Sequence, residues 1–271
     1  MQKFRTPSEA YLAVLADVVD NPEYRVSPRG QPIAEKTDYS FEVALPDASP
    51  IVTRSESRNK TIADYTHKEF EVYESGSRRV EDFAKISSFW KSLANPDGTI
   101  NSSYGHLIFK NQSCGNPTYE VQRKFLNEHD GNGGSEGVNL SELERTPWEW
   151  ASESLIQDKD TRQAIMHFNL PEHCWVGNRD VTCTMHGIFQ IRQDKLNLSV
   201  VMRSNDVVLG LVFDLPWFMH LIDRMVAALK PTYPALTKGH YRHMAHSMHV
   251  YGRDMEKVNM MLGRGMLSGA Q

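Results

Sequence analysis

The sequence predicts a single α+β domain. The chain has 271 residues, of which 40% are hydrophobic and 24% charged, enough for one large core or two small ones. Three runs of alternating or apolar residues, typical of strands, lie close together at 164–168, 183–191 and 196–202 and precede a long apolar helix at 215–229. We found neither an internal repeat nor a clear linker, so we expect residues 1–271 to fold as one unit.

The N-terminal part predicts helices and one strand. Residues 7–20 place apolar side chains at helical spacing, with Ser8 near the start. Because this segment also carries acidic residues, it is neither a signal peptide nor a membrane span. Residues 21–60, rich in Pro, Ser and charge, define fewer elements. We expect a strand at 39–45, helices at 64–76 and 83–94, and a turn at Asn95-Pro96-Asp97-Gly98.

The C-terminal part predicts the sheet. A polar, glycine-rich stretch at 127–137 is expected to be part of a mobile loop covering about 127–142. It does not resemble a phosphate cradle, because no strand leads into it and no Lys-Ser/Thr follows. Residues 148–157 should be helical, the turn 192–195 should join two strands as a hairpin, and 246–251 should form a final strand.

Charge and cysteine content exclude some classes of protein. The net charge is -4 and the isoelectric point about 6.3, so there is no basic excess for nucleic-acid binding. A few arginines still suffice to bind one phosphate. Cys114, Cys174 and Cys183 form no Cys-x-x-Cys pair, and their odd number argues against a disulfide scaffold. We therefore expect a reduced, cytoplasmic protein with no membrane partner.

Cys183 and Arg203, twenty residues apart, are the first candidates for chemistry. A free cysteine is usually buried and inert, but a nearby cation lowers the pKa of a thiol and activates it. Arg203 followed by Ser204 could bind a phosphate through a charged fork and a hydroxyl, or Arg203 could pair with a surface acid. Asp206 could simply cap the next segment.

The joint pattern resembles a known family. Arg203-Ser204-Asn205-Asp206-Val207-Val208-Leu209-Gly210 resembles the thymidylate synthase signature Arg-Ser-x-Asp-x-x-Leu-Gly, and Cys183 stands at the matching distance. Asp160-Thr161-Arg162 resembles the family's Asp-x-Arg-Arg, and His249-Val250-Tyr251 its His-x-Tyr. The resemblance covers about residues 60–255. Within the superfamily, segments 100–105, 202–208 and 247–251 look most similar to the phage-type deoxycytidylate (dCMP) hydroxymethylases.

The resemblance implies a fold and a reaction. The fold is a large mixed β-sheet covered by helices, and two copies pack through their sheets as a homodimer. The reaction converts dCMP and 5,10-methylenetetrahydrofolate to 5-hydroxymethyl-dCMP and tetrahydrofolate, through a covalent bond between the cysteine and C6. The location would be cytoplasmic, in the host cell if the protein is phage-encoded. A reductive C5 methylase making thymidylate or 5-methyl-dCMP, a dUMP or CMP hydroxymethylase, and a non-catalytic nucleotide-binding homologue remain alternatives.

The resemblance also implies residue roles. Cys183 is the nucleophile, Glu69 organises water and moves protons, and Tyr104 assists proton removal near C5. The nucleotide would be bound by Arg203, Ser204, His249, Tyr251, Asp214, Arg29 and, across the dimer interface, Arg162. The folate side would be lined by Trp90, Asp206, Leu209, Gly210 and Phe213, with Asp206 also counted among the catalytic residues.

Each of these residues has a structural alternative. Glu69 could be a solvated helix residue like Glu71 and Glu74, and Tyr104 could simply pack beside Gly105. The apolar candidates Trp90, Leu209 and Phe213 could be ordinary core. For each residue alone the structural reading is favoured, and only the joint pattern reverses that preference.

Asp214 indicates the base. The uracil-using synthases carry Asn here, whose amide donates to O4 and accepts from N3–H. Cytosine presents the reverse pattern, and a carboxyl group can accept from its amino group and donate to N3 if a proton is shared. A mismatched base leaves buried polar groups unpaired, so we favour cytosine. Asp214 could also cap the following helix.

The chain departs from the family pattern in three places. Gln163 replaces the second arginine of Asp-x-Arg-Arg, with Arg179 as a candidate to compensate, and Thr184 stands where synthases have His. Residues 266–271 do not resemble the tail that closes over folate, and a less sealed site favours water over reduction. His240, His243, His246 and His249 recur every third residue, but consecutive members of such a series on a strand face opposite sides, so we assign no metal.

Overall fold

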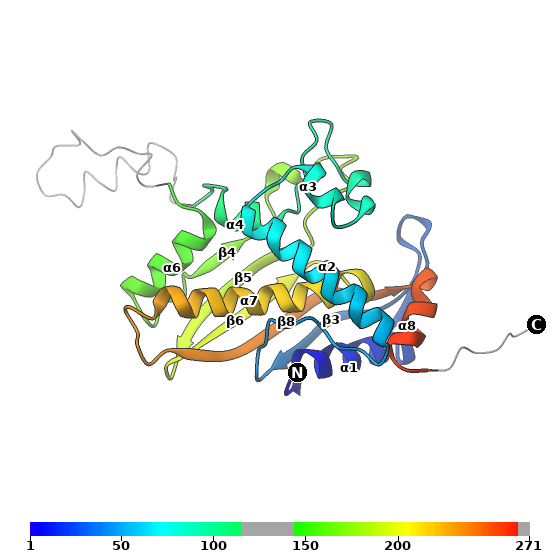
Figure 1. Cartoon of the computed structure of the whole chain (residues 1–271), viewed down its shortest axis with the longest axis horizontal. Helices are drawn as coiled ribbons and strands as arrows, with labels where there is room; N and C mark the ends of the chain where they lie inside the picture. The colour runs from blue at the N-terminus through cyan, green and yellow to red at the C-terminus, as the bar shows by residue number, and fades with distance from the viewer. Residues whose placement is uncertain (115–143, 265–271) are drawn as a thin grey trace, which may run out of the picture.

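The computed structural model describes residues 1–114 and 144–264, which form a mixed β-sheet with helices packed on it (Figure 1). The central sheet order is β1-β3-β8-β6-β5-β4, while β2 pairs with β3 and β7 with β8. β3–β8 and β5–β6 are antiparallel, whereas β6–β8 is parallel. The strands are β1 (Gln2–Phe4), β2 (Tyr24–Val26), β3 (Ile33–Val43), β4 (Ile165–His167), β5 (Thr184–Arg192), β6 (Lys195–Met202), β7 (Asn205–Asp206) and β8 (Thr237–Tyr251).

The predicted hairpin is confirmed, β3 and β8 are longer than the strands predicted there, and β4 is shorter than the predicted 164–168. Gln193 and Asp194 have φ of 53° and 55°, as a two-residue hairpin turn between twisted strands requires. The strand predicted at 246–251 is only the end of β8. The strand predicted at 39–45 overlaps the second half of β3, which begins at Ile33 and ends at Val43. The polar residues 35–37 concealed the first half of β3 in the sequence, because they pair with β8 while remaining partly or fully exposed.

Local capping explains the N-terminal helices. α1 (Pro7–Asp20) begins after Thr6, whose side chain accepts from the backbone N–H of Glu9 while Glu9 reciprocates, so Thr6 rather than Ser8 is the cap. α2 begins at Glu56, earlier than the predicted 64, because Ser55 caps it, and it ends at Ser75, before Gly76 with φ of 67°.

The single helix predicted at 83–94 is wrong. The chain instead forms α3 (Val80–Ala84) and the short 3₁₀ helix η2 (Ser88–Ser92). Ser87 separates them, because its extended backbone and its side-chain hydrogen bond to the N–H of Phe89 start a new helical turn. The turn at Asn95–Gly98 is confirmed by a hydrogen bond from Gly98 N to Asn95 O of 2.9 Å.

The remaining helices complete one layer. They are α4 (Tyr104–Phe109), α6 (Pro147–Gln157), α7 (Val212–Leu229) and α8 (Met255–Met261). The helices predicted at 148–157 and 215–229 are α6 and α7, whereas α4, α8, β1 and β2 were not predicted. The loop expected at about 127–142 and the segment 266–271 lie outside the described residues.

α7 is the centre of the core. Its side chains are buried on most sides, as predicted, and it crosses the sheet next to α2 (Figure 1). Phe218 of α7 stacks over Tyr241 of β8 at 6.3 Å between ring centroids. Since α1, α2 and α6 all contact α7, the helices share one face of the sheet. Within the described residues the opposite face carries no helix, and Met244, Val201 and Ile188 are half-buried there.

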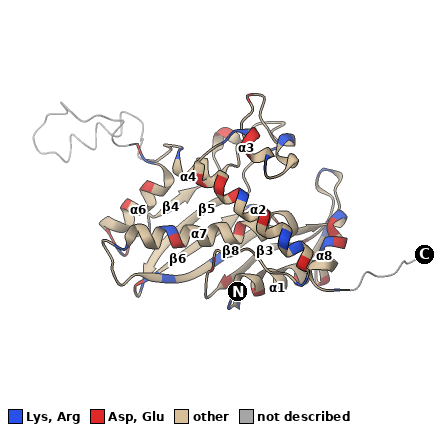
Figure 2. Ribbon diagram, viewed as in Figure 1, with Lys and Arg blue, Asp and Glu red and all other residues tan. Residues whose placement is uncertain are grey.

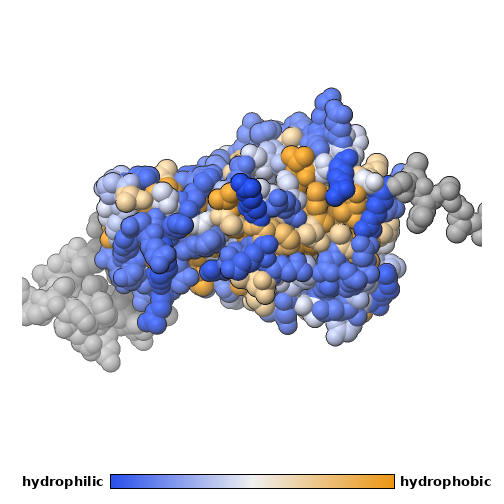
Figure 3. Space-filling view, turned by 90° about the horizontal axis from the view of Figure 1, so that it is seen from below, coloured by the Kyte–Doolittle hydropathy of each residue, from blue (hydrophilic) through white to orange (hydrophobic). Residues whose placement is uncertain are grey.

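The outer surface is mixed in character. Figure 2 shows Lys and Arg interspersed with Asp and Glu along α2 and around α8. Hydrophobic residues gather near the middle of the face in Figure 3, amid hydrophilic ones. An open groove between α1 and the residues after α8 is lined by Leu12, Ala13, Ala16, Leu262 and the charged residues Glu9, Arg54 and Arg264.

Two further features bear on the sequence analysis. The four histidines at 240, 243, 246 and 249 all lie on β8 and alternate in facing, with His243 and His249 buried and His240 and His246 more exposed. Across residues 1–114 and 144–264, no helix combines the length and the apolar character needed to cross a membrane.

Candidate active site

The β5–β6 hairpin brings Cys183 and Arg203 together. Cys183 immediately precedes β5 and Arg203 immediately follows β6, so the twenty-residue spacing is the length of the hairpin. The backbone N–H of Arg203 donates to the carbonyl of Cys183 at 2.9 Å, and Nη2 of Arg203 lies 3.5 Å from Sγ of Cys183. The same guanidinium donates to the carbonyls of Thr182 at 3.2 Å and Val181 at 2.6 Å, which fixes it beside the thiol.

Two opposing effects set the acidity of Cys183. Burial raises the pKa of this thiol, and the carboxylates of Asp214, Asp180 and Asp206 add to the rise. The guanidinium of Arg203 lowers the pKa and offsets part of that effect. Cys183 as a residue is half-buried rather than sealed in the core.

Glu69 is a buried carboxyl, not a solvated helix residue. Only 5% of Glu69 is exposed, whereas Glu71 on the same helix is exposed and Glu74 pairs with His220 at 2.7 Å. The hydroxyl of Tyr73 donates to Oε1 of Glu69 at 3.4 Å. Burial, and then the charge of Asp214, raise the pKa of Glu69 to about 8, so its side chain holds a proton at neutral pH.

Tyr104 connects the nucleophile's strand to Asp214. Oγ1 of Thr184, the residue after Cys183, donates to the Tyr104 hydroxyl at 2.8 Å, and Tyr104 also hydrogen-bonds to Asp214. Burial raises the pKa of Tyr104 well above 10, so it is a neutral phenol. Tyr104 reaches this position because α4 approaches α2 closely at Gly105, where an added Cβ would lie 1.8 Å from the carbonyl oxygen of Tyr73. Packing beside Gly105 and a place in the site therefore coexist.

Asp214 lies in the first turn of α7 and is half-buried. Nδ2 of Asn205 donates to its Oδ2 at 3.0 Å. Burial raises the pKa of Asp214 to about 6, against the hydrogen bonds from Asn205 and Tyr104, which lower it. This carboxyl can therefore carry a proton near neutral pH. The side chain makes no N-terminal capping bond on α7, so the capping alternative is wrong.

Asp206, by contrast, caps a helical turn through its side chain. Its Oδ1 accepts from the backbone N–H groups of Val208 at 2.8 Å and Leu209 at 3.2 Å, at the start of the π-helical turn η5 (Val207–Leu211). The β7–β8 pairing sets Asp206 opposite His249, and His249 partly offsets the rise in the pKa of Asp206 that burial causes. His249 contacts Tyr251 edge-on, with ring centroids 5.2 Å apart.

An aromatic cluster stands next to Glu69. Nε1 of Trp90 donates to the hydroxyl of Tyr65 at 3.1 Å, and Phe213 stacks on the Tyr65 ring at 4.0 Å between centroids. Leu209, on η5, is 44% exposed. Trp90 and Phe213 are therefore packed residues that also border the site, whereas Leu209 is not ordinary core.

The remaining predicted residues lie at the rim or further out. Ser204 is half-buried beside Arg203. Arg162 and Arg179 are exposed and make no hydrogen bond or ion pair with any residue that the structure describes. Arg29 is exposed, with φ of 52°, in the turn before β3, and contacts none of the other site residues. The fold therefore gathers Cys183, Arg203, Glu69, Tyr104, Asp214 and Asp206, but leaves these three arginines outside that group.

Sequence reasoning missed Tyr65, Tyr73 and Asn205. Tyr65, Glu69 and Tyr73 recur every fourth residue on α2, so a single helical stripe of hydroxyls around the buried acid was readable from the sequence. Asn205 sits inside the signature at a variable position, and nothing in its spacing indicates its hydrogen bond to Asp214 nine residues later.

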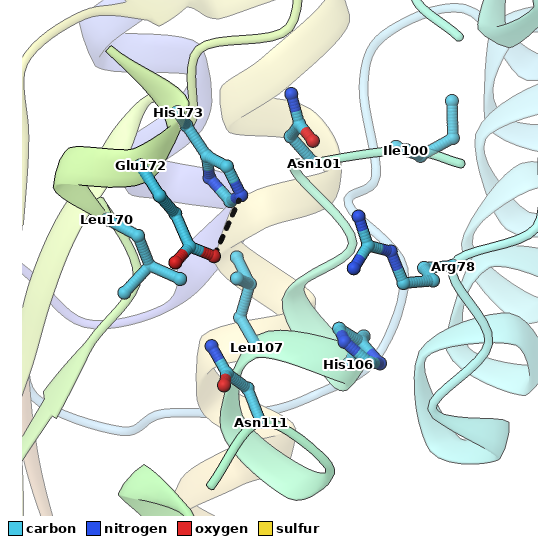
Figure 4. Close-up of a pocket in the computed structure, with 9 residues that line it drawn as sticks. All are labelled: Arg78, Ile100, Asn101, His106, Leu107, Asn111, Leu170, Glu172 and His173. Atoms are coloured by element: carbon cyan, nitrogen blue, oxygen red, sulfur yellow. Dashed lines mark ion pairs between the residues drawn. The ribbon is translucent and has the colours of Figure 1, made fainter. Parts of the chain in front are cut away.

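A small polar cavity lies beside the α4 start but is separate from this group (Figure 4). It has a volume of about 50 Å³ and is lined among others by Arg78, His106 and His173, with His173 paired to Glu172 at 3.8 Å. None of the predicted site residues lines it.

Asp180 accepts from the backbone N–H groups of Asn101 at 2.6 Å and Ser102 at 2.9 Å, and so ties the segment that leads to Cys183 to the segment before Tyr104.

Comparisons with known proteins agree with this arrangement. The family model described as Thymidylate synthase matches residues 9–270. The deoxycytidylate 5-hydroxymethyltransferase of Enterobacteria phage T6 is 28% identical over 203 residues, which cover 72% of this chain and 70% of that protein. Its namesakes from Enterobacteria phages T4 and T2 are 29% identical over 171 residues, 61% of this chain and 57% of theirs. Thermostable thymidylate synthase A from Bacillus subtilis has the same fold, with a TM-score of 0.65 over 97% of this chain and 86% of that one, at 18% identity.

Proposed function

The chain belongs to the thymidylate synthase family, and from this premise we propose that it is a dCMP hydroxymethylase. The substrates would be dCMP and 5,10-methylenetetrahydrofolate, and the products 5-hydroxymethyl-dCMP and tetrahydrofolate. The observation that carries the proposal is the protonatable carboxyl of Asp214, in the place where uracil-using synthases have an amide, within the same group as Cys183 and Glu69.

The choice of cytosine follows from hydrogen-bond complementarity. Cytosine offers a donor at its C4 amino group and an acceptor at N3, so the protein must present one acceptor and one donor in return. A carboxyl with a pKa of about 6 supplies both, through one bare oxygen and one proton shared with N3. Recognition of this kind discriminates strongly when the proton is held on the oxygen that faces N3, since the wrong base then leaves polar groups unpaired. The phage relatives named above favour the same substrate.

Covalent chemistry would begin at Cys183. Its sulfur bonds to C6 of the ring, the electron pair moves to C5, and C5 becomes a carbon nucleophile. Arg203, 3.5 Å from the sulfur, stabilises the thiolate that attacks and, with Ser204, can bind the phosphate. After the one-carbon unit is on C5, Tyr104 and its hydrogen-bonded neighbours assist removal of the C5 proton. Loss of that proton expels tetrahydrofolate and leaves an exocyclic methylene on C5. Elimination of the sulfur from C6 restores the aromatic ring only after water has added to this methylene.

Glu69 would handle water. The buried acid, protonated at neutral pH and held by Tyr73, can orient a water molecule and exchange a proton with it. Addition of that water to the exocyclic methylene on C5 gives the hydroxymethyl group. Overall, CH₂OH replaces the C5 hydrogen. The methylene comes from the folate and the OH from water, while the C5 proton and the remaining water proton pass to the two folate nitrogens, without any oxidation or reduction of the protein.

The residues present fit a folate. Its fused ring system is flat and needs an apolar surface at the edge of the site. The stacked pair Tyr65–Phe213, Trp90 and the exposed Leu209 provide one beside Glu69. When bound, 5,10-methylenetetrahydrofolate supplies a one-carbon unit at the oxidation level of formaldehyde. Trp90, Leu209, Gly210 and Phe213 would hold it, with Asp206 fixing the turn η5 that carries Leu209 and Gly210.

We further propose a homodimer. The sheet face opposite the helices carries half-buried Met244, Val201 and Ile188 and no covering element among the described residues, which suits packing against a second copy. Arg162 is exposed and unpaired within its own described subunit, so it is available to bind the phosphate of the neighbouring site. Gln163 cannot supply a second charge there.

The direct test is product analysis. The protein is incubated with 5,10-methylenetetrahydrofolate and an equimolar mixture of dCMP, dUMP and CMP, and the nucleotides are analysed by mass spectrometry. The proposal expects a dCMP product heavier by one CH₂O, with tetrahydrofolate as the co-product. A product heavier by CH₂, accompanied by dihydrofolate, would establish reductive methylation instead, and modification of dUMP or CMP alone would overturn the choice of dCMP.

A further inference from the structure

A carboxyl group does not by itself choose between cytosine and uracil. A protonated carboxyl has one donor oxygen and one acceptor oxygen, and the proton can reside on either. With the proton on the oxygen that faces N3, the group matches cytosine. With the proton on the oxygen that faces C4, it matches uracil equally well. Selectivity through Asp214 therefore requires a second group that decides which of its oxygens stays bare.

Asn205 has the contacts to make that decision. Its side chain is 2% exposed, and Nδ2 donates to Oδ2 of Asp214 at 3.0 Å and contacts Sδ of Met202 at 2.7 Å. The thioether sulfur of Met202 can only accept, so the amide nitrogen must face it, and the same nitrogen then donates to Oδ2 of Asp214. Oδ1 of Asn205 has no hydrogen-bond partner, so no other contact favours a flipped amide.

We propose that Asn205 is the positioning residue that makes Asp214 selective for cytosine, because its N–H holds Oδ2 as an acceptor and leaves the proton to Oδ1. This inference rests on the proposed function. Oδ2 then accepts from the C4 amino group as well as from Asn205, using its two lone pairs, and Oδ1 donates to N3. Uracil would need a proton on Oδ2, where it would meet the N–H of Asn205 head-on.

The other hydrogen-bond partner of Asp214 cannot make the same choice. Tyr104 has a hydroxyl, which donates or accepts as its neighbours require, so it adapts to either proton position. The amide N–H of Asn205 can only donate. Gly210 limits the movement of the Asn205 and Asp214 side chains. A Cβ added at Gly210 would lie 3.0 Å from Oδ1 of Asn205 and 3.3 Å from Oδ2 of Asp214. Backbone thus packs directly against the two side chains.

The first experiment removes the donor. Asn205→Leu keeps the approximate shape of the side chain but has no N–H. Release of tritium from 5-tritiated dCMP and from 5-tritiated dUMP is measured separately, and the ratio of kcat/KM for the two substrates is compared with that of the wild type. We expect this preference for dCMP to fall by about tenfold or more. Val208→Ala, a buried change in the adjoining turn, is the matched control and should alter both substrates alike.

The second experiment uses an amide at position 214. In Asp214→Asn, the donor of Asn205 forces the new amide oxygen into the place of Oδ2, so the new NH₂ faces N3 and dCMP stays preferred. In the double variant Asn205→Leu/Asp214→Asn the amide is free to turn, and dUMP should gain by about tenfold or more relative to the single variant. A merely structural role for Asn205 would lower both substrates and would not produce this coupling.

The outcomes separate the two proposals. If the wild type turns over dCMP but Asn205→Leu retains its preference and the double variant behaves like Asp214→Asn, the role of Asn205 is overturned while the proposed function stands. If the wild type turns over dUMP or nothing, the proposed function fails and the inference fails with it. If Asn205→Leu does not fold, as judged by circular dichroism, Asn205→Ala removes the same donor without added bulk and must show the same loss of preference.

Discussion

Replacing Glu69 by glutamine tests the claim that the site contains a buried, neutral acid. The glutamine side chain has nearly the same shape, accepts the hydrogen bond from Tyr73, and cannot ionise. In the folded protein burial and Asp214 raise the pKa of Glu69 from its ordinary 4.5 to about 8, so the fold favours the protonated form. The stability that this preference contributes is complete below pH 4.5 and is lost as the pH rises through 8.

The magnitude follows from linkage. At about 1.4 kcal/mol for each tenfold change in proton affinity, the interval from 4.5 to about 8 corresponds to about 5 kcal/mol of the free energy of unfolding. Because glutamine does not lose this contribution, Glu69→Gln should gain on the wild type with increasing pH. Relative to pH 4, we expect a gain of about 3 kcal/mol at pH 7 and of about 5 kcal/mol at pH 9. The same variant should lose turnover by about 100-fold or more, because water can no longer exchange a proton with residue 69.

The assay is urea unfolding at fixed protein concentration, since dimerisation would make stability depend on concentration. Free energies of unfolding are measured at pH 4, 7 and 9 for the wild type, Glu69→Gln and Glu71→Gln. Glu71 lies on the same helix but is exposed, so its variant should follow the wild type at every pH. A difference between Glu69→Gln and the wild type that does not change with pH would refute the reasoning.

Three other predictions follow from the site and its scaffold. Arg203→Met should raise the pH at which iodoacetamide alkylates Cys183, because the guanidinium lowers the pKa of the thiol. Peptide mass spectrometry measures the alkylation of Cys183 as a function of pH, with exposed Cys174 as the internal reference. An unchanged midpoint pH for Cys183 would contradict the prediction. Gly105→Ala should lower the free energy of unfolding in urea by about 3 kcal/mol, because its Cβ would meet the Tyr73 carbonyl. Gly252→Ala is the control and should change little, since the nearest atom to its Cβ would be 3.6 Å away. Similar costs for both variants would show that α4 does not need its close approach to α2. Mixing inactive Arg162→Ala with inactive Cys183→Ala subunits should restore about a quarter of wild-type activity. Half of the dimers are then mixed, and each mixed dimer has one intact site out of two. No recovery of activity under conditions that exchange subunits would argue against an arginine shared across the interface.

Local patterns predicted much of the scaffold. The amphipathic stretch at 7–20 and the apolar run at 215–229 gave α1 and most of α7, because helical spacing of apolar residues reflects a buried face directly. The β5–β6 hairpin followed from its strands and turn, and its length turned out to be the reason for the spacing between Cys183 and Arg203. The family resemblance, rather than the helical stripe of Tyr65, Glu69 and Tyr73, singled out Glu69 from Glu71 and Glu74.

The rest depended on contacts that no local pattern encodes. β3 passes through the polar residues 35–37, where pairing with β8 rather than burial holds the strand. The hydrogen bond between Asn205 and Asp214 crosses the π-helical turn η5, so it follows neither a helical nor a strand period. No local pattern indicates that Arg162, Arg179 and Arg29 are exposed and lie outside the group around Cys183. A role for any of these arginines in phosphate binding stays a prediction.

Trapping of the covalent adduct tests the central claim most directly. A fluorine in place of the C5 hydrogen of the nucleotide blocks the proton loss that later steps require, so the bond between the sulfur and C6 should persist. The protein is incubated with 5-fluoro-dCMP and 5,10-methylenetetrahydrofolate, digested, and mapped by mass spectrometry. We predict a peptide carrying the nucleotide at Cys183, formed with 5-fluoro-dCMP in preference to 5-fluoro-dUMP. An unmodified Cys183, or labelling by 5-fluoro-dUMP alone, would contradict the account.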